Sequence, residues 1–208
     1  MNWFFEHIEC VNLARRTDKW AECEREFAKH DLQVERFNAV DGNSIGYVGR
    51  LPDGAIGNLL SHIEIIRKAK NNGRKNVLIL EDDIEFDDDI NDKFRERAVT
   101  VPDNWDLLYL GGNHNNQPMV KVAPFVRHIT DTYATHAYSI RNTVYDLVLS
   151  ELGKIDTEGD VIMSRIQKQC NAYCFTPNLA WQRAGISDVF NTYVDYDFLR
   201  TKDGNTHG

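Results

Sequence analysis

Three consecutive acidic residues, Glu81, Asp82 and Asp83, directly follow the apolar run Val77–Leu80. A short apolar run of this kind is typical of a strand buried in a parallel sheet, and ligands bind outside the carboxyl ends of such strands. Adjacent carboxylates there repel one another by on the order of a few kcal/mol. Because a hard divalent cation relieves this repulsion and accepts phosphate oxygens, the three acids predict a Mn²⁺ or Mg²⁺ site. In an extended backbone Glu81 and Asp83 share one side, so we predict them as the metal ligands and expect Asp82 to point away.

The acidic run carries the whole charge excess of the chain. The net charge is 24 − 32 = −8, and eight acids with no base lie between Glu81 and Asp92. The remaining chain is therefore neutral, which excludes a broad basic face for nucleic acid. The later acids of the run fit the first turn of a helix. An EF-hand is excluded because the run lacks the glycine at the sixth loop position.

The elements that must position these acids alternate between strands and helices. Strands are expected over residues 3–13, 34–40, 77–80, 105–110, 135–140 and 173–175, with a hairpin over 119–129 and a loop over 42–57. Helices are expected over 15–30, 56–69, 142–152 and 161–169. The strand–helix order in the first eighty residues requires crossover connections, hence an α/β fold with a mostly parallel sheet flanked by helices and added antiparallel strands in the C-terminal half. We expect one domain over residues 1–200 and a polar tail over 201–208.

Ordered blocks along the chain resemble glycosyltransferase family 25, the lipooligosaccharide and procollagen galactosyltransferase-type enzymes with relatives in large DNA viruses. The blocks are Val11–Lys19, Arg36–Gly42, Gly54–His62, Leu78–Asp83, Trp105–Gly112, Thr135–Tyr138 and Pro177–Ala180, followed by Gln182 and Ser187-Asp188. One block alone would be weak. The set, in this order, covers most of residues 11–188 and is specific.

The resemblance implies a GT-A-like nucleotide-sugar fold and a metal-dependent transferase that inverts the anomeric carbon. The acidic trio would be its D-x-D-type motif, with Asp83 on the metal and Glu81 or Asp82 near the ribose or sugar. The chain departs from the family pattern at two positions. Asn58 replaces a frequent Cys, which we expect to alter packing only, and Lys19 replaces a frequent Arg, which keeps the charge but loses the planar fork.

Sugar transfer from a nucleoside diphosphate requires a slot for the base and positive charge for the leaving diphosphate. The predicted slot is lined by Asn12, Leu13, Ala39 and Val40. Asp41 would hydrogen-bond the ribose or base, or simply form the Asp41-Gly42 turn. Three cations at a helix start could hold phosphate or ribose, or be solvated helix residues: Arg15, Arg16 and Lys19.

An inverting enzyme also needs one base that takes the proton of the acceptor hydroxyl. The candidates are Asp160, Asp156, Asp188 and His136. In the family an acid heads the helix that comes after the Thr-His-x-Tyr strand and its helix, and Asp160 matches that place best, with Asp156 second. Helix N-capping is the alternative for Asp160. Gln182 and Asp188 would close the donor pocket, and His136 would face the sugar or be structural.

Two further histidines carry open interpretations. His62 is expected on a mostly apolar helix face, where a satisfied core histidine is the commoner case. His114, in the loop 112–116, is a candidate acceptor-loop or metal residue, and the loop 114–126 is a candidate acceptor side. Tyr138 is expected to pack in the core.

We therefore expect a glycosyltransferase with Mn²⁺ or Mg²⁺, a UDP-hexose donor and a glycan or glycoprotein acceptor. A sugar-1-phosphate nucleotidyltransferase would share the sheet and metal, but its glycine-rich loop is replaced here by Ala14-Arg15-Arg16. A non-catalytic nucleotide-sugar or carbohydrate-binding relative would have a damaged acidic motif, whereas this one is intact. Apolar runs of at most four residues and the absence of a secretory signal pattern predict a soluble, cytoplasmic chain, which a virus could encode for the host cytoplasm.

Overall fold

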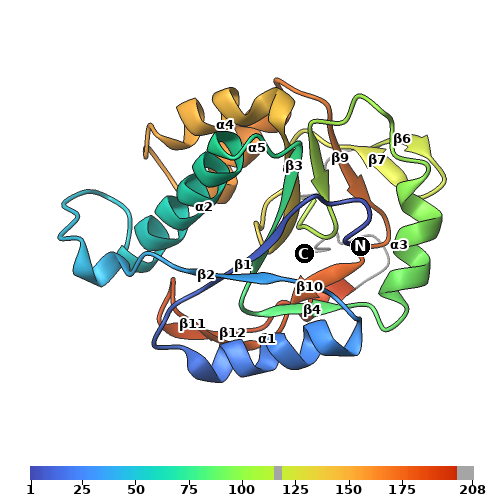
Figure 1. The fold of residues 1–208 in the computed structure, drawn as a ribbon. Helices are drawn as coiled ribbons and strands as arrows, with labels where there is room; N and C mark the ends of the chain where they lie inside the picture. Colours follow the sequence, from blue (N-terminus) through green and yellow to red (C-terminus); the bar gives the residue numbers. More distant parts are fainter. Residues whose placement is uncertain (115–118, 201–208) are drawn as a thin grey trace.

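Eight strands form the central sheet of the computed structural model, which describes residues 1–114 and 119–200 (Figure 1). In spatial order they are β2 (Glu35–Asn38), β1 (Ile8–Asn12), β3 (Asn76–Glu81), β8 (Ala137–Arg141), β5 (Leu107–Tyr109), β9 (Ala172–Phe175), β7 (Val126–His128) and β6 (Val120–Ala123). Only β8 and β7 run against the other strands of this sheet. The predicted mostly parallel α/β architecture, with antiparallel strands added in the C-terminal half, is confirmed.

Helices cover both faces of the sheet. The side chains of α2 (Asp53–Asn71), α4 (Tyr145–Leu152) and α5 (Gly159–Gln167) share one core, and those of α1 (Thr17–Lys29) and α3 (Ile90–Ala98) share the other. Figure 1 shows the first three helices grouped on one side of the sheet and α1 on the opposite side. Short 3-10 helices are η1 (Gly42–Ser44), η2 (Asn142–Val144) and η3 (Asp197–Arg200).

The strand β3 belongs to both cores. Val77 and Ile79 pack on the α2 side, Leu78 and Leu80 pack on the α1 side, and all four side chains are fully buried. Side chains alternate along a strand, so a continuous apolar strand needs cover on both faces. The end of β3, and with it Glu81, is therefore held in a fixed place.

Two small antiparallel sheets lie outside the central one. They pair β4 (Ile84–Phe86) with β10 (Ala180–Gln182), and β11 (Gly185–Ser187) with β12 (Thr192–Val194). Sequence analysis missed these strands because each has only three residues, too few for a periodic pattern. The first pair brings Gln182 beside the residues that follow β3.

Several predicted boundaries are wrong. β1 begins at Ile8 because the chain turns before it, with Phe4 N donating to Met1 O at 2.9 Å. The expected loop 42–57 is shortened because α2 begins at Asp53. The polar tail 201–208 and part of the loop 114–126 lie outside the described residues. No helix in the described part of the chain has the length and apolar character needed to cross a bilayer.

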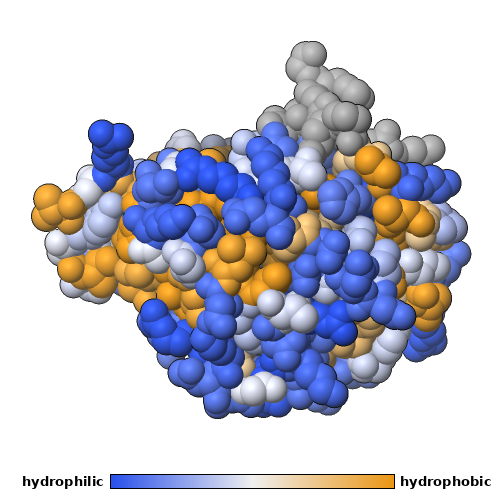
Figure 2. Space-filling model, turned by 90° about the horizontal axis from the view of Figure 1, so that it is seen from above, coloured by the Kyte–Doolittle hydropathy of each residue, from blue (hydrophilic) through white to orange (hydrophobic). Residues whose placement is uncertain are grey.

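The loop between β2 and α2 carries exposed apolar side chains. Figure 2 shows hydrophobic residues gathered at the left-hand end of the molecule, and Figure 1 places this loop at the same end. Ile45 is 41% exposed and Val48 is 97% exposed. The loop nevertheless has an anchor in the α2-side core, where Leu51 is buried and Tyr47 packs against the same core.

One end of this loop is fixed by a close approach of α2. A Cβ at Gly57 would lie 2.6 Å from Val40 O and 2.8 Å from Gly42 N, closer than backbone atoms allow. Ser61, one turn later, accepts from Val40 N at 2.8 Å and donates to Gly57 O at 2.7 Å. The helix thus sets the place of the chain segment that follows β2.

We expect Gly57→Ala to lower the free energy of unfolding. Overpacking costs about 1–3 kcal/mol, and improved helix propensity returns at most about 1 kcal/mol. Gly159→Ala in α5 is the matched control, because its nearest neighbour would be Leu59 Cδ1 at 3.4 Å. Urea unfolding checks both variants, and equal stability of Gly57→Ala and wild type would contradict the close approach.

Candidate active site

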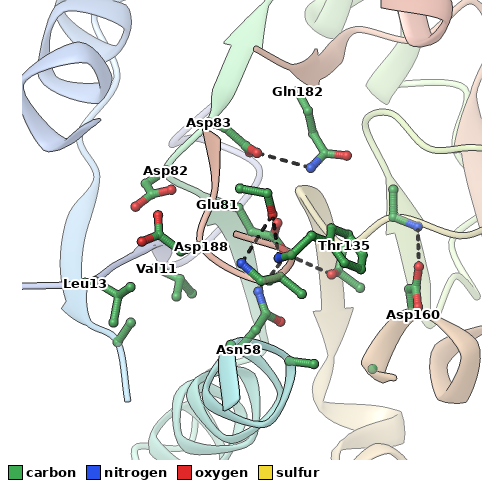
Figure 3. Close-up of a pocket in the computed structure, with 18 of the residues that line it drawn as sticks. Val11, Leu13, Asn58, Glu81, Asp82, Asp83, Thr135, Asp160, Gln182 and Asp188 are labelled. Carbon is green, nitrogen blue, oxygen red and sulfur yellow. Dashed lines mark hydrogen bonds between the residues drawn. The ribbon is translucent and has the colours of Figure 1, made fainter. Parts of the chain in front are cut away.

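A pocket of about 270 Å³ opens at the carboxyl ends of β1, β2 and β3 (Figure 3). The acidic trio lies between two walls. One wall is formed by the chain after β1 and β2, including Asn12, Leu13, Arg15, Ala39, Val40 and Asp41. The opposite wall includes Ala134, Thr135, Asp160, Gln182, Tyr196 and Phe198. The site thus has the place that sheet topology predicts for a ligand.

Glu81 is the best-partnered carboxylate of the trio. Its Oε1 accepts from Thr135 Oγ1 at 2.8 Å and from Asn58 Nδ2 at 3.3 Å, and His62 Nε2 lies 3.5 Å away. Burial raises the pKa of Glu81, but His62 and the Thr135 hydroxyl more than offset it, and the pKa is about 2. The expectation that Asn58 alters packing only is wrong, because its amide contacts this carboxylate.

Asp82 faces the wall formed by β1 and α1. Asn12 Nδ2 donates to its Oδ2 at 2.7 Å, and Lys19 Nζ donates to its Oδ1 at 3.1 Å. Burial raises the pKa of Asp82, and Lys19 opposes that shift. The expectation that Asp82 points away from the site is wrong, because β3 ends at Glu81 and the next two residues form a turn.

Asp83 keeps an oxygen without a partner. Gln182 Nε2 donates to its Oδ2 at 3.2 Å, whereas Oδ1 is buried and has no hydrogen-bond partner among the described residues. Burial, followed by the charge of Glu81, raises the pKa of Asp83 to about 7. Ionisation of this buried carboxylate is unfavourable without a positive charge beside it, and its Oδ1 has no partner in the described part of the chain. Asp83 is therefore suited to bind a hard cation.

The three carboxylates diverge toward different neighbours, as Figure 3 shows. Among the described residues, no three metal-ligating side chains of this pocket lie within 4.8 Å of one another. Asp83 can supply a protein ligand through its partnerless Oδ1, and Glu81 as a second ligand stays a prediction; water and phosphate oxygens would supply the remaining ligands. The donor set fits a divalent cation, with most positions left to its other ligands.

Asp188, between β11 and β12, gathers the cations that follow β1. Arg15 Nη2 and Lys19 Nζ each lie 3.3 Å from this carboxylate, and Arg16 Nη1 also contacts it. Lys19 joins Asp188 to Asp82. The positive charge predicted for a phosphate therefore lies at the pocket and is balanced here by the carboxylate of Asp188.

The two base candidates that rank first, Asp160 and Asp156, occupy different places. Asp160 lies in the first turn of α5 and lines the pocket, accepting from Val161 N at 2.8 Å and Ala134 N at 3.5 Å. Burial raises the pKa of Asp160. Asp156 lies outside the pocket, half-exposed and paired with Arg165 at 2.7 Å. The N-cap alternative for Asp160 is wrong, since the residue at that position is Glu158.

The residues of the predicted nucleotide slot lie together on the wall of the pocket. Asn12, Leu13, Ala39 and Val40 all line the pocket. Asp41 also lines it and accepts from Asn43 N at 3.1 Å, so both the site and the turn interpretations of Asp41 agree with the structure.

The histidines lie behind the pocket. His136 is buried, with its Nε2 3.2 Å from Ala180 O, so its structural alternative agrees with the observed position. His114 bonds Thr132 and Asn178 side chains, and burial lowers its pKa to about 4. The acceptor-loop or metal interpretation of His114 is therefore wrong.

The core interpretations of His62 and Tyr138 agree with the structure. His62 Nδ1 lies 2.8 Å from the Tyr138 hydroxyl, and the two rings stack. Sequence analysis missed Tyr196 and Phe198, whose rings pack edge to face with centroids 6.0 Å apart at the pocket. The only sign of these two residues in the sequence is their aromatic type, several positions after the last block at Ser187-Asp188.

Comparison with known proteins identifies relatives of the chain. The family model described as Glycosyltransferase family 25 (LPS biosynthesis protein) matches residues 5–195. A Drosophila pseudoobscura pseudoobscura protein named "Glycosyltransferase 25 family member" is 33% identical over 161 residues, which cover 64% of this chain and 25% of that protein. "Procollagen galactosyltransferase 2" of Homo sapiens is 26% identical over 51% of this chain and 21% of its own length. The matches thus span about a quarter of these curated relatives.

Other similarities are more distant. "Probable inactive glycosyltransferase 25 family member 3" of Rattus norvegicus is 26% identical, covering 65% of this chain and 28% of that protein. A solved apo-form glycosyltransferase, GlyE of Streptococcus pneumoniae TIGR4, is 13% identical with a TM-score of 0.47, covering 80% of this chain and 44% of that one. A glycosyltransferase involved in glycosylation of the major capsid of PBCV-1 is 13% identical with a TM-score of 0.37, covering 69% and 64%.

The raised pKa of Asp83 predicts a pH-dependent effect of Asp83→Asn on stability. The unfolded chain loses this proton near pH 4, whereas the folded chain keeps it to about pH 7, so ionisation destabilises the wild type progressively across that range. Asn cannot ionise. The free energy of unfolding of Asp83→Asn, relative to wild type, should therefore rise by roughly 2 kcal/mol between pH 5 and pH 8.

Urea unfolding in EDTA at both pH values measures this difference. The control is Asp146→Asn, a carboxylate whose side chain is 83% exposed, for which the difference from wild type should not change with pH. A constant difference between Asp83→Asn and wild type would show that Asp83 ionises as an ordinary carboxylate.

Proposed function

The chain belongs to glycosyltransferase family 25, and we propose that it transfers a hexose from a UDP-sugar to a hydroxyl group of a glycan or glycoprotein, with inversion and with Mn²⁺ or Mg²⁺. The observation that carries the proposal is the pocket itself. Asp83, with its partnerless oxygen, lies in the same pocket as Arg15 and Lys19, two of the cations that follow β1.

The nucleotide half of the site would be the wall formed after β1 and β2. The slot residues would receive the base, and Asp41 would hydrogen-bond the ribose or base. Arg15, Arg16 and Lys19 are already arranged around one anionic group, the carboxylate of Asp188. A diphosphate carries more charge than this carboxylate and could take over these contacts.

Asp83 would hold the divalent cation through Oδ1, the oxygen without a partner. A bound cation supplies neutralisation of the charge that develops on the leaving diphosphate. Glu81 is tied to Thr135 and Asn58, so its role would be to hold this end of the pocket and orient the sugar rather than to move. Lys19 would add a further positive charge beside Asp82.

Asp160 would be the base. It lies on the wall opposite the cations, and burial makes its carboxylate more basic than a solvated one. The acceptor oxygen would form a bond to the anomeric carbon while its proton passes to Asp160. The bond from that carbon to the diphosphate would break on the opposite face, which releases UDP and inverts the configuration.

We expect Asp83→Asn to reduce UDP release from a UDP-hexose at least 100-fold, the scale of losing one group that stabilises transition-state charge. EDTA should have the same effect on wild type. Asp89→Asn removes an exposed acid of the same run and should leave release unchanged. UDP release that survives both Asp83→Asn and EDTA would rule out the metal-dependent mechanism.

UDP binding without release would favour the non-catalytic alternative. That alternative has a specific basis, because relatives of similar identity in Rattus norvegicus and Mus musculus are named inactive. A calorimetric titration with UDP beside the release assay separates the two functions.

The assignment of the base predicts a contrast between two conservative variants. Asp160→Asn should lower kcat by about 10²–10⁴-fold with little change in the KM for the UDP-sugar. Asp156→Asn is the matched control, since this carboxylate is paired with Arg165 outside the pocket. Steady-state kinetics decide the assignment, and a larger kcat loss in Asp156→Asn would reverse it.

A further inference from the structure

A second group of ligand-type side chains lies toward the other end of β1. His7 Nε2 is 2.8 Å from Glu9 Oε1 and 3.4 Å from Glu35 Oε2. One ligand atom from each residue lies within 4.8 Å of the other two, which is true of no other trio of His, Cys, Asp or Glu in the described residues. None of the three residues lines the pocket.

The backbone aims these side chains at one another. Glu9 and Glu35 are direct partners in the parallel pairing of β1 with β2, so they project from the same face. His7 comes two residues before Glu9, and its carbonyl accepts from Leu78 N at 2.9 Å, which continues the strand pairing. A two-residue spacing along an extended chain again gives the same face. The convergence thus follows from strand register.

The cluster contains a buried carboxylate oxygen that no neighbouring group in the described part of the chain contacts by a hydrogen bond. Glu9 is fully buried, and its Oε2 has no hydrogen-bond partner among the described residues. Lys68 Nζ lies 3.2 Å from Glu9 and 2.8 Å from Glu35, and Arg74 adds a positive charge that acts on Glu35, but neither is a partner of Glu9 Oε2. Like charges on directly paired strand positions destabilise a sheet, and a buried carboxylate needs full compensation.

We propose that His7, Glu9 and Glu35 bind a zinc ion that joins the edge strand β2 to β1. Zinc ligand bonds of about 2.0–2.1 Å in a tetrahedron separate the ligand atoms by roughly 3.3 Å. The separations of 2.8 and 3.4 Å around His7 Nε2 are close to this value. An imidazole with two carboxylates favours zinc over magnesium, and water would be the fourth ligand.

Lys68 would leave the cluster when the ion binds. Its side chain is 39% exposed, so the ammonium can move into solvent. The zinc ion would then replace one positive charge with two. Because β2 has only four residues and leads directly into Ala39–Asp41, the ion would steady the wall that receives the nucleotide, without touching substrate.

Calorimetric titration of the metal-free full chain with ZnCl₂ near pH 7.5 tests the proposal. Wild type should bind one equivalent at this cluster and gain thermal stability. His7→Gln and Glu35→Gln should each weaken this binding at least tenfold. Glu64→Gln, which removes an exposed glutamate paired with Arg67, should not. Asp83→Asn should also retain it, which separates this site from the pocket.

Lys68→Gln tests the cluster in the opposite direction, because this variant should not weaken zinc binding. Removal of the competing ammonium should leave zinc binding as tight or make it tighter. Unchanged affinity in both His7→Gln and Glu35→Gln would overturn the proposal, and so would zinc binding lost only in Asp83→Asn. Glu35 is half-exposed, so its variant keeps the test decisive if His7→Gln folds poorly.

Discussion

Three carboxylates at the end of one doubly buried strand are the constraint on which this structure depends. The apolar side chains of β3 fix the backbone from both faces, so the acids that follow cannot move apart along the chain. The protein separates them by giving each a different neighbour. Glu81 has Thr135 and Asn58, Asp82 has Lys19, and Asp83 keeps an oxygen with no partner and a pKa of about 7.

The same electrostatic balance links the two halves of the pocket. Lys19 contacts both Asp82 and Asp188, so the acidic trio and the cation group belong to one network. Under the proposed function, a donor would bring negative charge to the cations and its metal would bring positive charge to Asp83. The negative charge of the diphosphate and the positive charge of the metal would then offset one another within this network, which favours binding of the metal and the diphosphate together.

Sequence reasoning succeeds here where the signal is local. The apolar run followed by acids predicts β3 and its position at the sheet edge. Asn12 and Gln182, from the ordered blocks, and Asp160, predicted from its place at a helix start, all line one pocket. It fails where the structure depends on pairing between distant segments. The three-residue strands have no periodicity, the turn at Asp82 breaks the alternation of an extended chain, and the His7 cluster exists only through the register of β1 with β2.

The central claim is that Asp83 holds a divalent cation beside the donor diphosphate. Its most direct test is the anomalous scattering of manganese in crystals soaked with MnCl₂ and UDP. The account predicts a manganese peak next to Asp83 Oδ1, with diphosphate oxygens in contact with the cations that now surround Asp188. Bound UDP with no manganese at Asp83, and with that carboxylate facing only water, would contradict it.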